Sequence, residues 1–273
     1  MRISIVTISY NQAPFLERCL RSVLDQGFAE LEYIVVDPGS SDGSREIIER
    51  YRSQIDSIIL EPDSGPAQGL NRGFDAATGE IFGYLNADDI LLPGALNRVA
   101  AWFREEPRAD VIYGNALLVD EEERVLRRML STRWSHLAYV YGSCNVAQQA
   151  TFMRSSAFRA VHGFNEANRT CWDGELLVEM SLNRARFSRR QDTIGGFRLH
   201  RNSITGSGRL REAIGSDGRR IFRRVMGRPH VALDGAIASA MRIWKVMSHP
   251  IDTLIKVLEL TGLLRRPTIN ERD

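Results

Sequence analysis

The chain has 273 residues, 43% of them hydrophobic and 26% charged, with a formal net charge of +2. This composition is that of an ordinary globular protein that can bury a substantial core. Three widely spaced cysteines argue against a disulfide framework or a zinc knuckle, and the apolar run at the N-terminus is too short for a signal peptide. No run approaches the roughly 18 apolar residues of a membrane span. We therefore expect a cytoplasmic protein.

The first 120 residues alternate between two hydrophobic periods. Continuous apolar runs predict strands at residues 3–8, 31–36, 55–60, 81–85 and 111–113. Helical spacing of apolar residues predicts helices at residues 14–26, 44–51, 66–77 and 93–103. Strands and helices in such regular alternation predict a parallel sheet that is covered by helices on both faces.

The pattern loosens after residue 120. The charged stretch 121–128 is typical of a solvated hairpin turn, and weaker signals predict a strand at 150–154 and helices at 155–161 and 174–184. A polar Gly/Ser stretch at 202–209 resembles a mobile lid. From residue 210 onward we expect helices with breaks at Gly227 and His249.

Three polar segments follow three of the predicted strands, at residues 7–11, 37–42 and 86–89. In open parallel sheets, ligands bind in the crevice outside the carboxyl ends of the strands. We therefore expect these segments to converge on one binding site.

Two adjacent carboxylates, Asp88 and Asp89, lie in the third of these segments. Neighbouring buried charges of one sign are costly, and a hard divalent cation such as Mg²⁺ or Mn²⁺ relieves the repulsion. Alternatively, one of the pair caps the helix predicted from Pro93. Asp37 fits two interpretations as well, since it can accept hydrogen bonds from a base or ribose, or form a turn with Pro38 and Gly39.

Two common nucleotide motifs are absent from the sequence. No lysine follows the glycines in the pattern of a phosphate-binding loop, and the first strand is not followed by the glycine fingerprint of a dinucleotide site. These absences argue against an NTPase and against a dehydrogenase.

Several segments together resemble family 2 glycosyltransferases. They are SIVTISYNQAPFLERCLRSVLDQ, IVVDPGSSDGS, EPDSGPAQGLNRGFDAATGEIFGYLNADD and the later QQATFMR, GFNE and WDGELLVEM. The resemblance covers roughly residues 3–205. It implies an α/β fold of the type A glycosyltransferase class: a single Rossmann-like, mixed but mostly parallel sheet flanked by helices. The implied catalytic domain spans 1–205, with a nucleotide-sugar-binding half at 1–120 and an acceptor-binding half at 121–205. A basic helical extension follows at 206–273.

The resemblance also implies roles for residues in the donor half. Asp37 matches the position that binds the nucleobase, and the loop with Thr7, Ser9 and Tyr10 lines the same pocket. Arg72 matches a basic position near the nucleotide. The acidic D-x-D signature of the family appears here as Asn86-Ala-Asp88, followed by Asp89. Asp88 is then the expected metal ligand, whereas Asn86 and Asp89 are expected near the substrate.

The expected catalytic base comes from the later acidic motif Trp172-Asp-Gly-Glu175, in which Asp173 is the first choice and Glu175 the second. The alternative is that these acids only favour the start of a helix. His200 matches a position that sometimes contributes to metal or diphosphate binding, although a lone histidine is more often structural.

The implied activity is inverting, metal-dependent transfer of a sugar from a nucleotide-diphosphate sugar to a hydroxyl. The acceptor is expected to be a glycan or a lipid-linked molecule in cell-surface polysaccharide synthesis, and the metal Mg²⁺ or Mn²⁺. Two alternatives stay open: a nucleotidyltransferase, and a non-catalytic nucleotide-sugar or carbohydrate-binding module with the same fold.

The C-terminal part is basic, with 14 Lys and Arg against 7 Asp and Glu from His200 onward. Arginines at helical spacing in 216–228 and amphipathic patterns in 236–247 and 251–264 suit an anionic membrane surface. The same patterns also suit helices that pack on the catalytic domain or form a homodimer contact. No aromatic interleaving or nucleic-acid-binding module supports a nucleic-acid partner.

Overall fold

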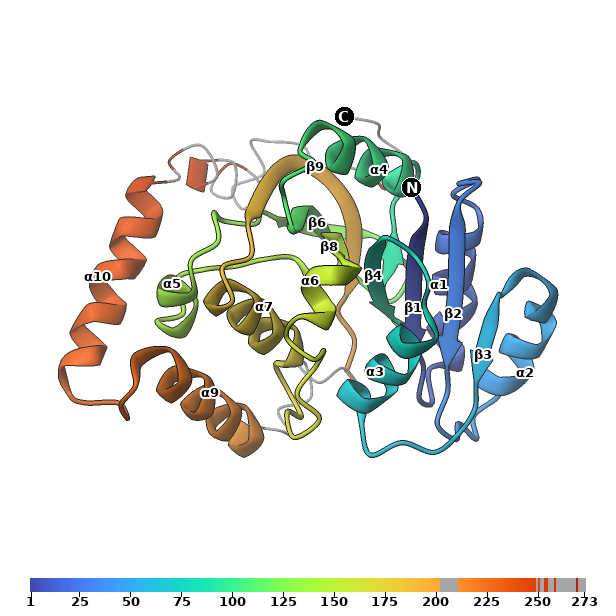
Figure 1. Ribbon diagram of the computed structural model, residues 1–273, viewed down its shortest axis with the longest axis horizontal. Helices are drawn as coiled ribbons and strands as arrows, with labels where there is room; N and C mark the ends of the chain where they lie inside the picture. The colour runs from blue at the N-terminus through green and yellow to red at the C-terminus, as the bar shows by residue number, and fades with distance from the viewer. Residues whose placement is uncertain (202–210, 249, 251–252, 255–257, 259–268, 270–273) are drawn as a thin grey trace.

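The structure is a computed structural model that describes residues 1–201, 211–248, 250, 253–254, 258 and 269 (Figure 1). Within these residues the strands form one nine-stranded sheet in the order β3-β2-β1-β4-β8-β6-β9-β5, with β7 paired to β6. The sheet is mixed, as expected, and helices cover both of its faces.

The first half of the sheet is parallel. It consists of β1 (Ile3–Ile8), β2 (Leu31–Val36), β3 (Ser57–Ile59) and β4 (Ile81–Asn86). β1 lies at its centre, so that Ile8 pairs with Val36 of β2 on one side and with Asn86 of β4 on the other. The three strands therefore end level with one another, and the polar residues after them share one edge.

The second half of the sheet is mostly antiparallel. Its strands are β5 (Ile90–Leu91), β6 (Val111–Val119), β7 (Val125–Met129), β8 (Thr151–Arg154) and β9 (Phe187–Arg198). β8 runs antiparallel to both β4 and β6 and joins the two halves, whereas β6 and β9 run parallel. β9 then pairs with β5, which brings the C-terminal end of β9 to the end of β4.

The helices of the first half form two layers. On one face lie α1 (Ala13–Leu24), α2 (Ser44–Arg50) and α4 (Ala95–Glu105), whose apolar residues share a core with β1 and β2. On the other face α3 (Pro66–Ala76) packs against the sheet with Leu70 and Phe74. The 3-10 turns η1 (Arg52–Gln54) and η2 (Gln148–Ala150) precede β3 and β8.

The second half adds α5 (His136–Val140), α6 (Ser155–Arg159) and α7 (Trp172–Leu182), of which α6 and α7 extend the core beside α3. Two helices of the extension follow: α9 (Arg211–Met226) and α10 (Leu233–Ser248). α9 contacts α5 and α7, while α10 stands at the left of Figure 1, on the side of the molecule away from β3.

Most predicted elements are confirmed, and the differences have local causes. The hairpin at 121–128 is the β6–β7 turn, and Gly227 separates α9 from α10. The strand predicted over 55–60 shortens to Ser57–Ile59, and Ile55 serves as the C-cap of η1 instead. The helix predicted from Pro93 begins at Ala95, after Gly94 adopts a left-handed turn with φ of 77°.

Several elements go beyond what the sequence predicted. β6 continues to Val119, and β5, α5 and β9 were not predicted at all. The stretch 202–209 and nearly all of 251–264 lie outside the described residues. In the part of the chain that is described, no helix has the length and apolar character needed to cross a bilayer.

Candidate active site

A cleft of about 680 Å³ lies at the carboxyl ends of β1, β2 and β4. Ser9 and Tyr10 line it after β1, Pro38 and Gly39 after β2, and Asn86 to Asp88 at the end of β4. The three predicted segments therefore do converge. Residues of the second half, among them Gln148, Thr170 and Asp173, line the same cleft.

The lining of the cleft carries polar atoms without partners. Among the described residues, Ser9 Oγ, Asn86 Oδ1 and Gln148 Oε1 are buried and accept or donate no hydrogen bond. A buried polar atom that is left unpaired costs free energy, so that such atoms are rare unless a ligand or water satisfies them. Their position around one cavity fits a polar ligand with several hydroxyl or phosphate groups.

Asp88 and His200 meet at the end of β4. Nε2 of His200 lies 2.9 Å from Oδ2 of Asp88, and the imidazole packs at 4.6 Å from the ring of Phe15. Nε of Arg198 donates to the backbone carbonyl of Asp88 at 2.8 Å. The end of β9 thus fixes both the main chain and the carboxylate of Asp88, which lines the cleft.

Asp89 has a different environment from Asp88. Its side chain is fully buried, with Oδ2 accepting from Gln149 at 2.8 Å and from Asn86 at 3.3 Å, and Oδ1 from the backbone N–H of Arg198. Burial, and then the charge of Asp88, raise the pKa of Asp89 well above its usual value. The raised pKa favours the uncharged form of Asp89, which lessens its repulsion with Asp88. The hydrogen bonds of Asp89 also hold Asn86 and the end of β9 in place.

Asp173 lies in the first turn of α7 and lines the cleft. Burial raises the pKa of its carboxyl group. Hydrogen bonds from the backbone N–H groups of Gly174 and of Asp173 itself lower the pKa, but they offset the effect of burial only in part. A carboxylate with a raised pKa is a stronger base than an ordinary aspartate. Gly174 lets Tyr139 of α5 lie directly against this turn, since a side chain there would overlap the Tyr139 hydroxyl.

Three of the expected donor residues lie behind or beside the cleft. The carboxylate of Asp37 is fully buried and accepts from the N–H groups of Gly39 and Ser40, so that it shapes the turn that lines the cleft. Thr7 is buried with its hydroxyl 2.9 Å from that of Tyr33. Arg72 donates to the backbone carbonyls of residues 61 and 62, outside the lining.

Glu175 also points away from the cleft. Its carboxylate accepts hydrogen bonds from Arg220 of α9 and from Asn165 and Asn168 of the preceding loop. Burial alone would raise the pKa of Glu175, but these hydrogen bonds outweigh burial and lower it. Asp173, and not Glu175, is therefore the acid of this motif that faces the cleft.

The residues around Asp88 fit a divalent cation. Within the described residues no three His, Cys, Asp or Glu side chains gather as a complete metal site. Mg²⁺ and Mn²⁺, however, are commonly held by only one or two protein carboxylates, and substrate phosphates and water fill the other positions. The carboxylate of Asp88 and the unpaired Oδ1 of Asn86 could hold such an ion, whereas His200, predicted as a second metal ligand, has its Nε2 on Oδ2 of Asp88 and could orient that carboxylate.

Several lining residues were missed by sequence reasoning. They come from the segment after β3, from β4 itself, from η2 and from the start of α7 with the loop before it, and they are Asp63, Tyr84, Gln148, Gln149, Thr170 and Trp172. The paired glutamines of the QQATFMR segment were a visible signal. Asp63, Tyr84 and Trp172 lie inside segments that carry the family resemblance. No local pattern marks them as lining residues, because the tertiary fold brings them to the strand ends.

Comparisons with known proteins agree with this architecture. An uncharacterized glycosyltransferase of Nostoc sp. is 36% identical over 130 residues, which are 44% of this chain and 40% of that protein. A PGL/p-HBAD biosynthesis glycosyltransferase of Mycobacterium tuberculosis is 29% identical over 68% of this chain and 72% of its own length. The chain thus spans less than half of the Nostoc relative.

Among solved structures, the mannosyltransferase PcManGT of Pyrobaculum calidifontis, in complex with GDP-Man and Mn²⁺, has a similar fold. It superposes with a TM-score of 0.62 over 97% of this chain and 81% of its own, at 15% identity. The model of the family described as "Glycosyl transferase family 2" matches residues 4–162, more than half of the chain. The chain therefore belongs to glycosyl transferase family 2.

Proposed function

We propose that the protein is an inverting, metal-dependent glycosyltransferase that moves a sugar from a nucleotide-diphosphate sugar to an acceptor hydroxyl. The observation that carries the proposal is that one cleft is lined both by Asp88, which is paired with His200, and by Asp173. Asp88 with its partner His200 suits the binding of a metal and a diphosphate, whereas Asp173 suits the role of proton acceptor. Together they supply the two functions that such a transfer needs.

The nucleotide of the donor would bind at the ends of β1 and β2. Ser9 and Tyr10 line this part of the cleft together with the turn at Pro38 and Gly39, which Asp37 holds in shape. Tyr10 is 61% exposed, so that its ring is accessible for stacking on a base. The similar fold of PcManGT, whose structure holds GDP-Man and Mn²⁺, supports this class of donor.

The diphosphate would lie at the end of β4. Asp88 and Asn86 would hold the Mg²⁺ or Mn²⁺ ion, which would supply Lewis-acid neutralisation of the charge on the leaving diphosphate. His200 keeps the Asp88 carboxylate oriented, because its ring is itself fixed against Phe15. Asp89 stays behind this surface and holds the amide of Asn86.

Asp173 would act as the general base. It would take the proton from the acceptor hydroxyl at its carboxylate while that oxygen forms a bond to the anomeric carbon and the bond to the diphosphate breaks. Attack from the face opposite the leaving group inverts the anomeric centre in one displacement. The raised pKa of Asp173 increases its affinity for the proton that it must accept.

The acceptor would be a glycan or a lipid-linked molecule at the cytoplasmic face of a membrane. α10 presents Ile243, Trp244 and Met247, which are 63%, 60% and 74% exposed, beside the basic residues Arg242 and Lys245. Exposed apolar and aromatic side chains next to cations suit the interface of an anionic bilayer. We therefore propose that α10 docks the enzyme on such a surface.

A panel of donors tests the proposal. The full chain is incubated with UDP-GlcNAc, UDP-Glc, UDP-Gal or GDP-Man, with and without Mn²⁺, and nucleoside diphosphate release is measured in the presence of candidate glycan and polyprenyl-linked acceptors. Metal-dependent release of a nucleoside diphosphate is expected. In parallel incubations with nucleoside triphosphates and a sugar phosphate, release of pyrophosphate would instead indicate a nucleotidyltransferase, and would contradict the proposal.

The variant Asp173→Asn separates an enzyme from a binding module. It should bind the donor with Mn²⁺ as the wild type does but lose about 10²-fold to 10⁴-fold of the transfer rate, the range expected for general base catalysis. Asp75→Asn, on the exposed side of α3, is the matched control. Transfer at the wild-type rate by Asp173→Asn would refute the role of Asp173.

A further inference from the structure

The helix α9 follows the segment that the sequence assigns to the catalytic domain. Resting on the proposed function, we infer that α9 positions the catalytic base of the active site. Through Arg220 and Asp217 it holds the loop 165–171 against α7, and Arg220 is thus a positioning residue for Asp173.

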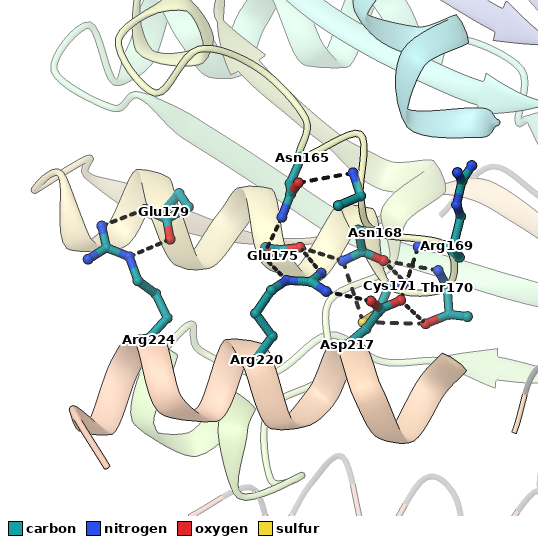
Figure 2. A network of polar contacts seen from close by, with 11 residues as sticks. Asn165, Asn168, Arg169, Thr170, Cys171, Glu175, Glu179, Asp217, Arg220 and Arg224 are labelled. Carbon is teal, nitrogen blue, oxygen red and sulfur yellow. Dashed lines mark hydrogen bonds and ion pairs between the residues drawn. The ribbon is translucent and has the colours of Figure 1, made fainter. Parts of the chain in front are cut away.

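One guanidinium bridges two carboxylates from different elements. Arg220 donates through Nε and Nη2 to Glu175 of α7, at 3.1 and 2.7 Å, and through Nη1 to Asp217 of its own helix at 2.7 Å (Figure 2). Such forked contacts are specific to arginine, since a lysine ammonium cannot present the same planar set of donors.

The two carboxylates in turn hold the loop. Oδ2 of Asp217 accepts from the backbone N–H of Arg169 at 3.0 Å and from the Thr170 hydroxyl at 2.8 Å. The carboxylate of Glu175 accepts from the side-chain amide of Asn168 at 2.6 Å. Arg220 therefore acts on the loop indirectly, through Glu175 and Asp217, which both hydrogen-bond to the loop (Figure 2).

Asn168 completes the connection inside the loop. Its side-chain oxygen accepts from the backbone N–H groups of Thr170 and Cys171, both at 2.9 Å, and its side chain is fully buried. The main chain from residue 169 to 171 is thus tied to the network at three successive N–H groups. Thr170, which belongs to this hydrogen-bonded segment, lines the cleft, and so does Asp173 two residues after the segment ends. The network therefore sets the direction in which Asp173 points.

Among the described residues, Arg220 is the cation that pairs with both Glu175 and Asp217. Glu175 and Asp217 are only 7% and 4% exposed, and each accepts several hydrogen bonds. Without the guanidinium, two mostly buried carboxylates would lose the positive charge that both of them contact, which is costly. The loop would then be released in part, because moving the carboxylates toward water breaks their bonds to Asn168, Arg169 and Thr170.

A second ion pair between the same helices provides a control. Arg224 of α9 donates to both carboxylate oxygens of Glu179 of α7 at 2.8 and 2.9 Å, four residues further along each helix (Figure 2). Within the described part of the chain, its side-chain hydrogen bonds go to Glu179 and not to the loop. Arg224→Gln thus removes a similar link between α7 and α9 but leaves the loop contacts intact.

Hydrogen exchange of the full chain tests the positioning directly. Arg220→Gln and Asp217→Asn should speed exchange of the amides of residues 169–171 by about 10-fold or more, since a hydrogen bond to a charged group changes the opening equilibrium by roughly that factor. Arg224→Gln should leave these amides at the wild-type rate. Unchanged exchange in Arg220→Gln and Asp217→Asn, or equal acceleration in Arg224→Gln, would overturn the inference.

Kinetics with the active donor and acceptor add a functional readout. Arg220→Gln should lower kcat by about 10-fold to 100-fold, as expected for a misplaced catalytic group, and leave the affinity for UDP with Mn²⁺ within about 2-fold. The acid limb of the pH–rate profile of Arg220→Gln should also move to lower pH. A loosened loop admits water to Asp173, and hydration lowers the raised pKa of its carboxyl group. A wild-type kcat and pH profile in Arg220→Gln would refute the inference. Absence of transfer in the wild type would refute the proposed function and leave the exchange result to decide the inference.

Discussion

His200 and Asp88 are 112 residues apart in the sequence, yet Nε2 of the imidazole lies 2.9 Å from Oδ2 of the carboxylate. β9 creates this contact, because it pairs with β5 immediately after the β4 segment and delivers His200 to the strand end. The histidine is 5% exposed and packs on Phe15, so that it is rigid. A fixed imidazole beside a cleft-lining carboxylate is well placed to hold or orient a metal ligand.

Substitutions of this pair should weaken metal-dependent nucleotide binding. We expect His200→Gln to lower the affinity for UDP in the presence of Mn²⁺ by about 10-fold to 100-fold, the range observed when an orienting partner of a metal ligand is lost. Asp88→Asn should lower it at least as much. Calorimetric titration measures both, with Asp75→Asn as control. Equal affinities in His200→Gln and the wild type would show that the histidine has only a packing role.

The raised pKa of Asp173 predicts the shape of the pH–rate profile. A general base acts when it is deprotonated, so kcat/KM should fall as the pH drops through the folded-state pKa of Asp173. Because burial raises this pKa, the fall should begin at a higher pH than for an ordinary aspartate, whose pKa is about 3.9. A profile that stays flat down to about pH 4 would contradict the assignment of Asp173.

The raised pKa of Asp173 also predicts how the stability of the protein depends on pH. Folding disfavours charged Asp173, so its destabilising effect is absent below the unfolded pKa and grows as the pH rises through the folded pKa. Asp173→Asn, which is neutral at every pH, should therefore have a higher Tm than the wild type at pH 7 and a similar Tm near pH 3. A lower Tm for Asp173→Asn at pH 7 would contradict this account of the site.

Part of this site was predictable from the sequence because it depends on local signals. Continuous apolar strands that each end in small polar residues identify β1, β2 and β4, and parallel pairing then forces Ser9, Gly39 and Asn86 to one edge. The hydrophobic period of each strand can be read without the rest of the chain, and neighbouring parallel strands present their carboxyl ends at the same edge of a sheet. The convergence on one cleft could therefore be inferred before the structure.

The rest depends on contacts between distant segments. β9 (FSRRQDTIGGFR) has few apolar residues and two glycines, and it forms because β6 and β5 offer partners on both sides. Arg198 at its end is fully buried, with its charge facing the backbone carbonyls of Asp88 and Asp120 and the carboxylate of Glu123. No pattern within β9 indicates these partners, which is why the strand was missed.

Gly174 is a second position that only the structure identifies. A methyl group there would overlap the Tyr139 hydroxyl and ring, which are packed against the start of α7. Gly174→Ala should lower the free energy of unfolding by about 1–3 kcal/mol, as overpacking does, and should also reduce transfer because Asp173 is adjacent. Thermal unfolding and the transfer assay measure the two effects.

A helical glycine with free space around it is the matched control. Gly218 of α9 is exposed and a side chain there meets nothing within 4 Å, so that Gly218→Ala should be neutral or stabilise by up to about 1 kcal/mol. The double variant Gly174→Ala/Tyr139→Leu should recover part of the lost stability, since the clash is removed. Additive losses in the double variant would show that Tyr139 is not the cause.

The exposed residues of α10 predict membrane binding. The double variant Ile243→Ser/Trp244→Ser should bind vesicles containing anionic phospholipid at least about 10-fold more weakly than the wild type, because it removes two interfacial apolar side chains. Leu137→Ser, which changes an exposed leucine of α5, should bind as the wild type does. Unchanged binding by the double variant, or a change from dimer to monomer without vesicle binding, would contradict a membrane role for α10.

The central claim is that Asp88, oriented by His200, holds the metal and diphosphate of a donor in the cleft that Asp173 faces. Anomalous diffraction from crystals soaked with Mn²⁺ and UDP tests it most directly, since manganese can be located without reference to the protein density. We predict a manganese peak within coordination distance of Asp88 that is bridged to both phosphates of UDP. UDP bound in the cleft with Asp88 uncoordinated, or manganese bound elsewhere, would contradict the account.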